Sequence, residues 1–376
     1  MIILHFALKN EWDSESLNGS YGINCITRNG YIPCFNVSDI KNTQISLSTL
    51  KDYIILCIDT NKLENTIKNE IVPISNTLCP CIYGNIPSDA IVEILPYTFN
   101  DNDIFTPSEE LLDFEIINEV CSKLNIQYQS KKYFHDGTTS RIILLNNEFI
   151  IKMAKKEQLK AEATFANYYS NVPTLQKIAY ADSEYKFLVY NFIPGDVMHT
   201  VTDFEDLARN IKVIVSAYKN FASDFLGYVD TPVNSWTQFL KNEVEHSAEY
   251  FSESKNLLPT VYDAIEELNK YPFNKKLIHG DFGTHNFIKR DEKFIAAIDP
   301  TPVIGDATYD LLYALVSNVD LLPFLSVNYL TSYIKEPKTK IEALLKVVLF
   351  CRICKCVKYN KEALDTYLDF WYNLFK

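Results

Sequence analysis

Short apolar runs separated by polar turns occupy the first hundred residues, and they predict strands. Three of these runs, Ile2 to Phe6, Lys51 to Ile58 and Ala90 to Leu95, are rich in Ile, Leu and Val. Gly, Pro, Asn and Ser interrupt the intervals between them, as is typical of turns between strands. A short helix is expected over Asn61 to Ile67. The pattern therefore predicts a compact α+β domain over residues 1–98.

The hydrophobic pattern changes after this domain. Residues 97–106 are polar and lack periodicity, which predicts a linker. From Leu111 to Leu124 apolar residues recur at helical spacing and indicate an amphipathic helix. Thr106 and Glu109, with a Pro between them, are typical of a helix start at which Thr106 is the cap.

A strand, a turn and a second strand are expected from Tyr133 to Met153. The turn covers residues 135–141. Small residues there can bring backbone N–H groups close to a phosphate, although a plain hairpin turn has the same composition. The candidate phosphate-contacting residues in this turn are Gly137, Thr138 and Ser140.

Lys152 interrupts an otherwise apolar strand and needs a partner, because an unpaired buried charge is costly. Glu162 follows on a helix expected over residues 155–169. In protein kinases a strand Lys that is paired with a helix Glu contacts the nucleotide phosphates, and we predict the same pair here. Glu157 is the rival partner, nearer the helix start. The non-functional alternative is an edge-strand Lys whose ammonium reaches solvent.

Two short apolar runs within residues 277–309 each end on a carboxylate. One leads into the sequence HGDFGTHN, which spans His279 to Asn286, and the other leads into Asp299. Both runs are typical of short buried strands. We therefore expect Asp281, Asn286 and Asp299 to lie at neighbouring strand ends, close enough to share a ligand.

These three residues match the needs of phosphoryl transfer. A carboxylate must orient the attacking hydroxyl and take its proton, and kinases space this Asp and a metal-binding Asn as D-x-x-x-x-N. Asp281 is therefore the candidate catalytic base. Asn286 and Asp299 are candidate Mg²⁺ ligands, since Mg²⁺ prefers oxygen donors. The alternative is an ordinary loop that contains several Asp residues.

The motif H-G-D-x-x-x-x-N, followed by I-D-P at Ile298 and G-D-x-x-Y-D-L at Gly305, resembles the aminoglycoside phosphotransferase family of small-molecule kinases. The resemblance implies a two-lobed protein-kinase-like fold after the first domain, and an α+β class overall. The expected N-lobe with its leading helix covers residues 99–192, and the mostly helical C-lobe covers residues 193–376. It also implies a segment between the lobes that meets the adenine edge of the nucleotide, at Tyr190, Asn191 and Phe192.

The resemblance further implies an ATP- or GTP-dependent, Mg²⁺-dependent phosphotransferase that acts on a hydroxyl of an aminoglycoside-type antibiotic and confers resistance. Residues 196–270 contain thirteen Asp and Glu against six Lys and Arg. In this family a helical insertion supplies carboxylates for amino-sugar ammonium groups. Candidate substrate residues are His285, Glu245, Glu249 and Glu266, although each Glu also fits a solvated surface charge. The alternatives are a metabolite kinase for a sugar, choline or amino alcohol, and a non-catalytic nucleotide sensor.

The first domain resembles a small bacterial domain family of unknown function, related in fold to ADP-ribosyltransferases. The resemblance rests on Ile3-Leu4-His5 and on residues 30–34 and 82–92. That family has His at two positions where this chain has Pro33 and Cys81. We therefore expect a binding or structural role for this domain, with His5 as a satisfied core residue.

Composition narrows the range of partners. The 376 residues are enough for two or three domains, and the net charge of −12 argues against nucleic acid as the main partner. No apolar run approaches the roughly 18 residues of a membrane span, so no membrane partner is expected. Nine Cys without an export signal indicate reduced thiols in a cytoplasmic protein. Cys351, Cys354 and Cys356 are expected to be buried free thiols, because no second cluster accompanies them.

Overall fold

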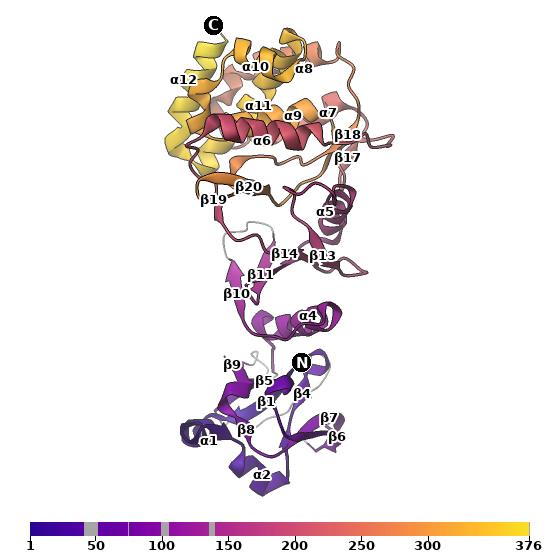
Figure 1. The fold of residues 1–376 in the computed structure, drawn as a ribbon, viewed down its shortest axis with the longest axis vertical. Coiled ribbons are helices and arrows are strands. Elements are labelled where there is room, and N and C mark those ends of the chain that lie inside the picture. Colours follow the sequence, from indigo (N-terminus) through magenta and orange to yellow (C-terminus); the bar gives the residue numbers. More distant parts are fainter. Residues whose placement is uncertain (41–51, 74, 99–104, 135–139, 376) are drawn as a thin grey trace. The chain divides into compact units, whose positions relative to one another are not determined.

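The computed structural model describes residues 1–40, 52–73, 75–98, 105–134 and 140–375 (Figure 1). The chain forms two compact units. The first comprises residues 1–132 and 145–147, and the second comprises residues 133–144 and 148–376.

The first unit is built on a four-stranded antiparallel sheet in the order β4-β1-β5-β9, with smaller sheets β2-β8 and β3-β7-β6. Strand β1 is buried along nearly its whole length, which is why its sequence is a continuous apolar run. The elements are β1 (Ile2–Leu8), α1 (Lys9–Glu15), β2 (Ser20–Tyr21), α2 (Ile23–Asn29), β3 (Ile32–Pro33), β4 (Phe35–Asn36), α3 (Val37–Ile40), β5 (Tyr53–Asp59), β6 (Thr66–Val72), β7 (Thr77–Tyr83), β8 (Ile86–Pro87), β9 (Ile91–Pro96) and α4 (Glu109–Leu124).

The expected helix over Asn61 to Ile67 is wrong. A 3-10 turn, Thr60–Lys62, is followed by strand β6. In the part of the chain that the structure describes, strand β6 lies at the edge of its sheet and pairs with β7. Most of its residues are exposed, so its sequence lacks the apolar alternation by which a half-buried strand is recognised.

Helix α4 groups with the first unit, whereas the sequence placed it at the head of the kinase N-lobe. The Asn118 side chain accepts a hydrogen bond from the N–H of Ile2 at 2.6 Å and donates one to its carbonyl at 2.9 Å. The cap of this helix is Ser108, whose hydroxyl accepts from the N–H of Leu111, and not Thr106. Both residues are good capping types, and the backbone path decides between them.

The second unit begins with a five-stranded sheet in the order β10-β11-β12-β14-β13. Strand β12 lies inside the sheet, between β11 and β14, so Lys152 is not on an edge strand. Helix α5 follows β12 in the chain and carries Glu162 on a buried position. The elements are β10 (Lys131–Phe134), β11 (Arg141–Leu145), β12 (Phe149–Met153), α5 (Lys156–Tyr168), β13 (Ile178–Ala181) and β14 (Leu188–Asn191).

The rest of the second unit is mostly helical, with two small sheets, β15-β19-β20 and β17-β16-β21-β18. Figure 1 shows the helices gathered on one side of these strands and the five-stranded sheet on the other, in the two-lobed arrangement expected from the sequence. The elements are β15 (Asp196–Val197), α6 (Phe204–Ser216), β16 (Leu226–Tyr228), β17 (Pro232–Val233), α7 (Trp236–Ala248), α8 (Leu258–Leu268), β18 (Lys276–Ile278), β19 (Phe287–Arg290), β20 (Lys293–Ala297), β21 (Val303–Gly305), α9 (Ala307–Val316), α10 (Val327–Ile334), α11 (Lys338–Tyr359) and α12 (Leu364–Leu374).

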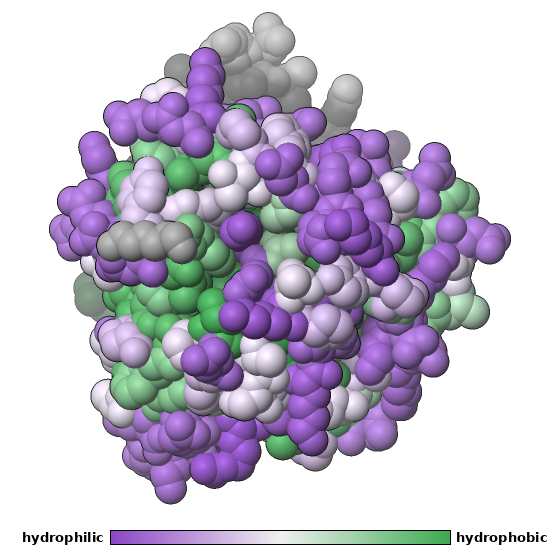
Figure 2. All heavy atoms as spheres, turned by 90° about the horizontal axis from the view of Figure 1, so that it is seen from above, coloured by the Kyte–Doolittle hydropathy of each residue, from purple (hydrophilic) through white to green (hydrophobic). Residues whose placement is uncertain are grey.

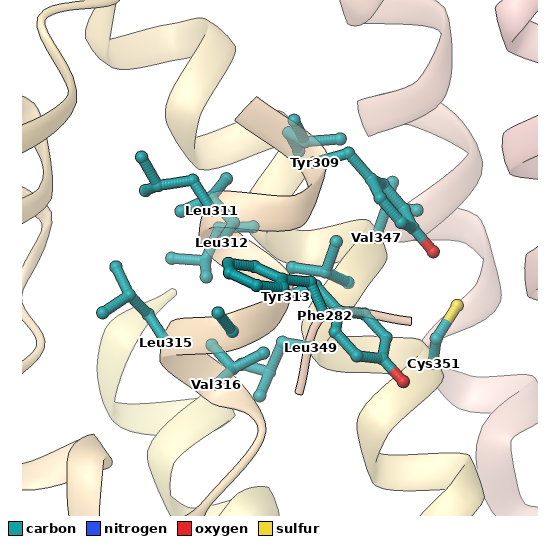
Figure 3. Close-up of a cluster of buried hydrophobic side chains, with 14 of the residues drawn as sticks. Phe282, Tyr309, Leu311, Leu312, Tyr313, Leu315, Val316, Val347, Leu349 and Cys351 are labelled. Carbon is teal, nitrogen blue, oxygen red and sulfur yellow. The ribbon is translucent and has the colours of Figure 1, made fainter. Parts of the chain in front are cut away.

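Helix α11 runs through the core of the helical lobe and packs against α7, α8, α9 and α12. Figure 3 shows Phe282, Tyr309 and Tyr313 packed among aliphatic side chains, with both Tyr hydroxyls on the side of the cluster where Cys351 lies. Cys351, Cys354 and Cys356 are buried free thiols on α11, as expected, and the other six Cys are also free.

Hydrophilic side chains cover much of the helical end of the molecule, around an area of exposed hydrophobic residues (Figure 2). In the ranges that the structure describes, no helix has the length and apolar character needed to cross a membrane. The α+β class and the two-lobed arrangement after the first domain are confirmed.

Candidate active site

Lys152 lies at the centre of a buried network on the sheet side of the site. Its ammonium is 2.7 Å from Glu162 Oε1 and also donates to Asp299. Tyr190 donates to the other Glu162 oxygen at 2.9 Å. Burial would lower the pKa of Lys152, but the carboxylates of Asp299 and Glu162 raise it above its ordinary value, so the side chain stays charged. The rival partner, Glu157, is exposed.

Asp310 holds the loop that follows β18. Its two carboxylate oxygens accept the backbone N–H groups of His279 at 2.7 Å and Gly280 at 3.0 Å. The hydroxyl of Tyr218 donates to it at 2.8 Å. Three donors on one fully buried carboxylate fix the path of the loop immediately before Asp281.

His279 connects the end of β18 with the segment that follows β20, the two strand ends that were expected to lie together. Its Nε2 lies 3.0 Å from the carbonyl of Ile298, and its own carbonyl accepts from Thr301 at 2.9 Å. The side chain is fully buried, and burial lowers its pKa to about 4, so the ring is neutral at pH 7. His279 is therefore structural: it braces the segment that carries Asp299 against the loop that carries Asp281.

Gly280 is required by the same junction. Its φ is +82°, and a Cβ built there would lie 1.9 Å from the carbonyl oxygen of Thr301. A side chain at this position would push the two loops apart.

Asp281 is surrounded by donors. Tyr313 donates to Oδ1 at 2.8 Å, Asn286 Nδ2 donates to Oδ2 at 3.0 Å, and His285 Nε2 is 3.2 Å from both oxygens. Burial acts to raise the pKa of Asp281, but His285, the Lys355 ammonium and the Tyr313 hydroxyl hold it well below its usual range. Its side chain is 34% exposed, so this carboxylate is both ionised and accessible.

Asn286 and Asp299 are joined through the backbone, since the N–H of Ile298 donates to the carbonyl of Asn286 at 2.9 Å. The amide nitrogen of Asn286 is used by Asp281, which leaves its Oδ1 as an oxygen donor. Asp299 has a left-handed φ of 57°, and its side chain is 52% exposed. The two oxygen donors fit Mg²⁺, which takes few protein ligands when phosphates supply the rest.

The expected nucleotide-contacting segments are placed only in part. Gly137 and Thr138 lie outside the described residues, and Ser140 is half-buried just before β11. The N–H groups of Asn191 and Phe192 donate to the carbonyls of Lys177 and Glu148 at 3.0 and 2.8 Å. These two N–H groups are therefore committed within the fold, and the Tyr190 side chain points inward to Glu162 rather than toward a hinge surface.

The expected acceptor residues are dispersed. Glu245 and Glu249 are exposed on or just after α7, and Glu266 on α8 binds Lys241 at 2.8 Å and Asn269 at 3.0 Å. Of the four candidates, His285 is the one whose described contacts include Asp281. Among the residues placed by the structure, no three His, Cys, Asp or Glu side chains form a metal-binding group.

Sequence reasoning missed Tyr313 and Lys355, which lie behind Asp281. Tyr313 lies one helical turn after Asp310 on α9, so an anchoring Asp310 implies that Tyr313 faces the same loop. Lys355 interrupts the apolar run of α11, just as Lys152 interrupts β12, and its ammonium lies 5.6 Å from the centre of the Tyr313 ring. Glu243 is buried on α7, where it accepts the Tyr228 hydroxyl at 2.9 Å.

In the first unit, the structure brings together the three positions singled out in the sequence. Pro33 and Cys81 are cross-strand partners, and His5 Nδ1 is 2.7 Å from the carbonyl of Pro33. His5 Nε2 is 3.1 Å from the Tyr21 hydroxyl, so both ring nitrogens have partners. His5 is 3% exposed and is a satisfied core residue, as expected.

Comparisons with known proteins agree with this division. Residues 6–94 match a family model described as "Protein of unknown function (DUF952)". No curated protein sequence matches the chain.

Several solved structures are similar to the kinase-like part. Aminoglycoside 2′-phosphotransferase-IIIa in its GDP complex is 14% identical, with a TM-score of 0.46, and the match covers 69% of this chain and 97% of that one. A putative fructosamine-3-kinase from Haemophilus somnus is 13% identical, with a TM-score of 0.47, over 68% of this chain and 96% of that one. One from Thermobifida fusca is 15% identical, with a TM-score of 0.46, over 68% of this chain and 99% of that one. The chain thus joins a segment that matches a domain family of unknown function to a two-lobed unit, with a five-stranded sheet in one lobe and mostly helices in the other.

Proposed function

We propose that this protein is a small-molecule kinase that transfers the γ-phosphoryl group of ATP or GTP to a hydroxyl of its acceptor. The observation that carries the proposal is Asp281. It is an ionised, accessible carboxylate on a rigid loop, beside the paired oxygen donors Asn286 and Asp299 and within the same unit as the Lys152–Glu162 pair. Phosphoryl transfer relies mainly on positioning and charge neutralisation, which these groups can supply.

Each residue has a role in the proposed transfer. Asp281 orients the acceptor hydroxyl and takes its proton as the oxygen bonds to the γ-phosphorus. The bond from that phosphorus to the β-phosphate oxygen breaks, and the nucleoside diphosphate leaves. Lys152, held by Glu162, contacts the phosphates. Asn286 and Asp299 would hold Mg²⁺, which neutralises phosphate charge when it is bound.

Two acceptor classes rest on different observations. An aminoglycoside-type antibiotic is supported by the motif resemblance and by the negative charge of the chain. A metabolite, as in a sugar or amino-alcohol kinase, is supported by the surroundings of Asp281. Lys355 lies beside the Tyr313 ring, behind this carboxylate. The described contacts of Glu245, Glu249 and Glu266 do not include Asp281. A non-catalytic nucleotide sensor is disfavoured because the base, the Lys–Glu pair and the metal donors are all present.

The test is acceptor-dependent release of ADP or GDP, with ATP and GTP offered across a panel of aminoglycosides and hydroxylated metabolites. We expect Asp281→Asn to bind nucleotide and to lose roughly 10²- to 10⁴-fold in turnover, the usual contribution of a general base. Asp291→Asn is the matched control, since Asp291 is exposed and its φ of 50° suits Asn. Full activity of Asp281→Asn would overturn the proposal.

A further inference from the structure

Asn286 contacts Oδ2 of Asp281, whereas Tyr313 contacts Oδ1. The residues around Tyr313 therefore lie behind the Oδ1 side of the carboxylate. The Tyr313 hydroxyl contacts Asp281, and the Lys355 ammonium lies 5.6 Å from the centre of the Tyr313 ring. Glu243 and Tyr228 form a hydrogen-bonded pair near the same Lys, close enough for Glu243 to influence it through charge. Four elements, β16, α7, α9 and α11, thus converge behind the base.

Lys355 is a half-buried cation without a direct partner. Throughout the described ranges no carboxylate lies within 4.0 Å of its ammonium, and no hydrogen bond to the ammonium is present. Its pKa lies above the ordinary value, chiefly through the nearby Tyr313, Glu243 and Asp281, so it is an ammonium at pH 7.

An ammonium that no carboxylate contacts directly keeps its N–H donors available for an anion, and a charge-assisted hydrogen bond relieves the cost of its partial burial. Tyr313 links the two groups, since its hydroxyl contacts Asp281 at 2.8 Å and its ring centre lies 5.6 Å from the Lys355 ammonium. We propose that Lys355 binds an acidic group of the acceptor, so that the substrate is a hydroxylated small molecule bearing a carboxylate or phosphate near its reactive hydroxyl. The inference rests on the proposed phosphotransferase function and specifies its substrate class.

A polycationic acceptor fits this arrangement poorly. Its ammonium groups would meet Lys355 behind the base, where like charges repel more strongly than in open solvent. The exposed carboxylates Glu245 and Glu249 compensate little, because charges in solvent are screened. An acidic group bound to Lys355 would also orient the acceptor, because Lys355 would hold one end of the short molecule and Asp281 would contact the hydroxyl at the other end.

Matched pairs of acceptors test the proposal. Gluconate is compared with gluconamide, glycerate with glyceramide, and glycerol phosphate with glycerol, and kanamycin serves as the polycation. For the wild type we expect kcat/KM to favour each anionic member by about 10- to 100-fold, the usual worth of a hydrogen bond between charged groups. Glycerol phosphate and the carboxylates separate the two kinds of acidic group.

Substitutions at Lys355 then assign the preference to this residue. Lys355→Met should reduce the ratio within each pair to below about threefold, mainly through KM, whereas Lys355→Arg should keep it. Lys358→Met, on the exposed face of the same helix, should keep the wild-type ratio. The Arg variant guards against a folding defect, because it preserves the charge and most of the volume.

Three outcomes would overturn the inference. Equal turnover of the acid and its neutral partner by the wild type would do so while leaving the kinase function intact. A uniform loss of kcat in Lys355→Met, with the ratios unchanged, would show that Lys355 acts only on the charge of Asp281. If neither nucleotide supported transfer to any acceptor, the phosphotransferase itself would fail, and the inference with it.

Discussion

Tyr313 donates a hydrogen bond to Asp281 across the junction between helix α9 and the catalytic loop, at 2.8 Å. The same helix carries Asp310, which holds the backbone N–H groups of His279 and Gly280. One helix therefore fixes both the path of the loop and the orientation of its carboxylate. Its own start is fixed by Asp306, which caps the helix through the N–H of Thr308 and binds Lys340 at 2.9 Å.

Tyr313→Phe should lower kcat by about 10- to 100-fold, because a hydrogen bond to a charged group is worth roughly 1.5–3 kcal/mol and the ring itself is retained. The affinity for nucleotide should not change, since Tyr313 contacts the base and not the Lys152 side of the site. Steady-state kinetics with saturating acceptor measures the effect. Tyr309→Phe, one turn earlier on α9, is the control and should be near wild type. An unchanged kcat in Tyr313→Phe would show that the loop alone orients Asp281.

The Lys152–Glu162 pair predicts an asymmetry in stability. Glu162→Ala should destabilise the second unit by about 3 kcal/mol or more, because it leaves a buried ammonium whose remaining carboxylate partner among the described residues is the half-exposed Asp299. Glu162→Leu combined with Lys152→Met should recover much of this loss, since a packed apolar pair avoids the desolvation cost. Chemical denaturation measures both effects. The double variant should nevertheless bind nucleotide weakly.

The exposed pair Lys156–Glu184, 3.4 Å apart and also anchored on α5, is the control for this comparison. Glu184→Ala should cost less than about 1 kcal/mol, as is usual for surface ion pairs. A loss in Glu184→Ala equal to that in Glu162→Ala would contradict the assignment of the effect to burial.

The sequence predicted the site residues that lie close to one another along the chain in a recognisable spacing. Asp281, Asn286 and Asp299 lie within one short stretch, and the separation of Lys152 and Glu162 is that of a strand followed by a helix, so both groups could be recognised in one dimension. The packing of α9 and α11 brings Tyr313 to Asp281 and Lys355 to the Tyr313 ring. A single sequence does not specify which face of a buried helix meets a distant loop. The inward direction of Tyr190 depends on strand register, which the hydrophobic pattern of an almost wholly buried strand leaves open.

Boundaries were the least predictable part of the fold. Thr106 and Ser108 are both good caps, and the structure uses Ser108. Edge strand β6 has too few buried residues to be told from a helix or a loop.

Substitutions at Gly280 and at Gly30 can be compared to separate the effect of a steric clash from that of backbone strain. Both have φ near +80°, but a Cβ at Gly280 would strike the Thr301 carbonyl, whereas nothing lies within 4 Å of one at Gly30. Gly30→Ala should cost about 1–2 kcal/mol, the strain of a left-handed L-residue. Gly280→Ala should cost clearly more and should also lower kcat, because relief of the clash displaces Asp281. Thermal unfolding and kinetics measure the two effects, and equal costs would mean that the loop relaxes freely.

The buried His5 makes the stability of the first unit depend on pH. Burial lowers its pKa from 6.5 to about 4. Between these values the unfolded chain binds a proton that the folded chain does not, so stability rises with pH across this window and is fully present above pH 6.5. The full contribution of His5, lost as the pH falls from 6.5 through 4, is about 3 kcal/mol at 1.36 kcal/mol per pKa unit. His5→Gln, which can keep one hydrogen bond and cannot titrate, should lose less stability over the same range. Amide hydrogen exchange along β1 measures this difference locally and separates it from His279, which lies in the other unit. Parallel pH dependence in the two proteins would show that His5 accepts a proton without unfolding.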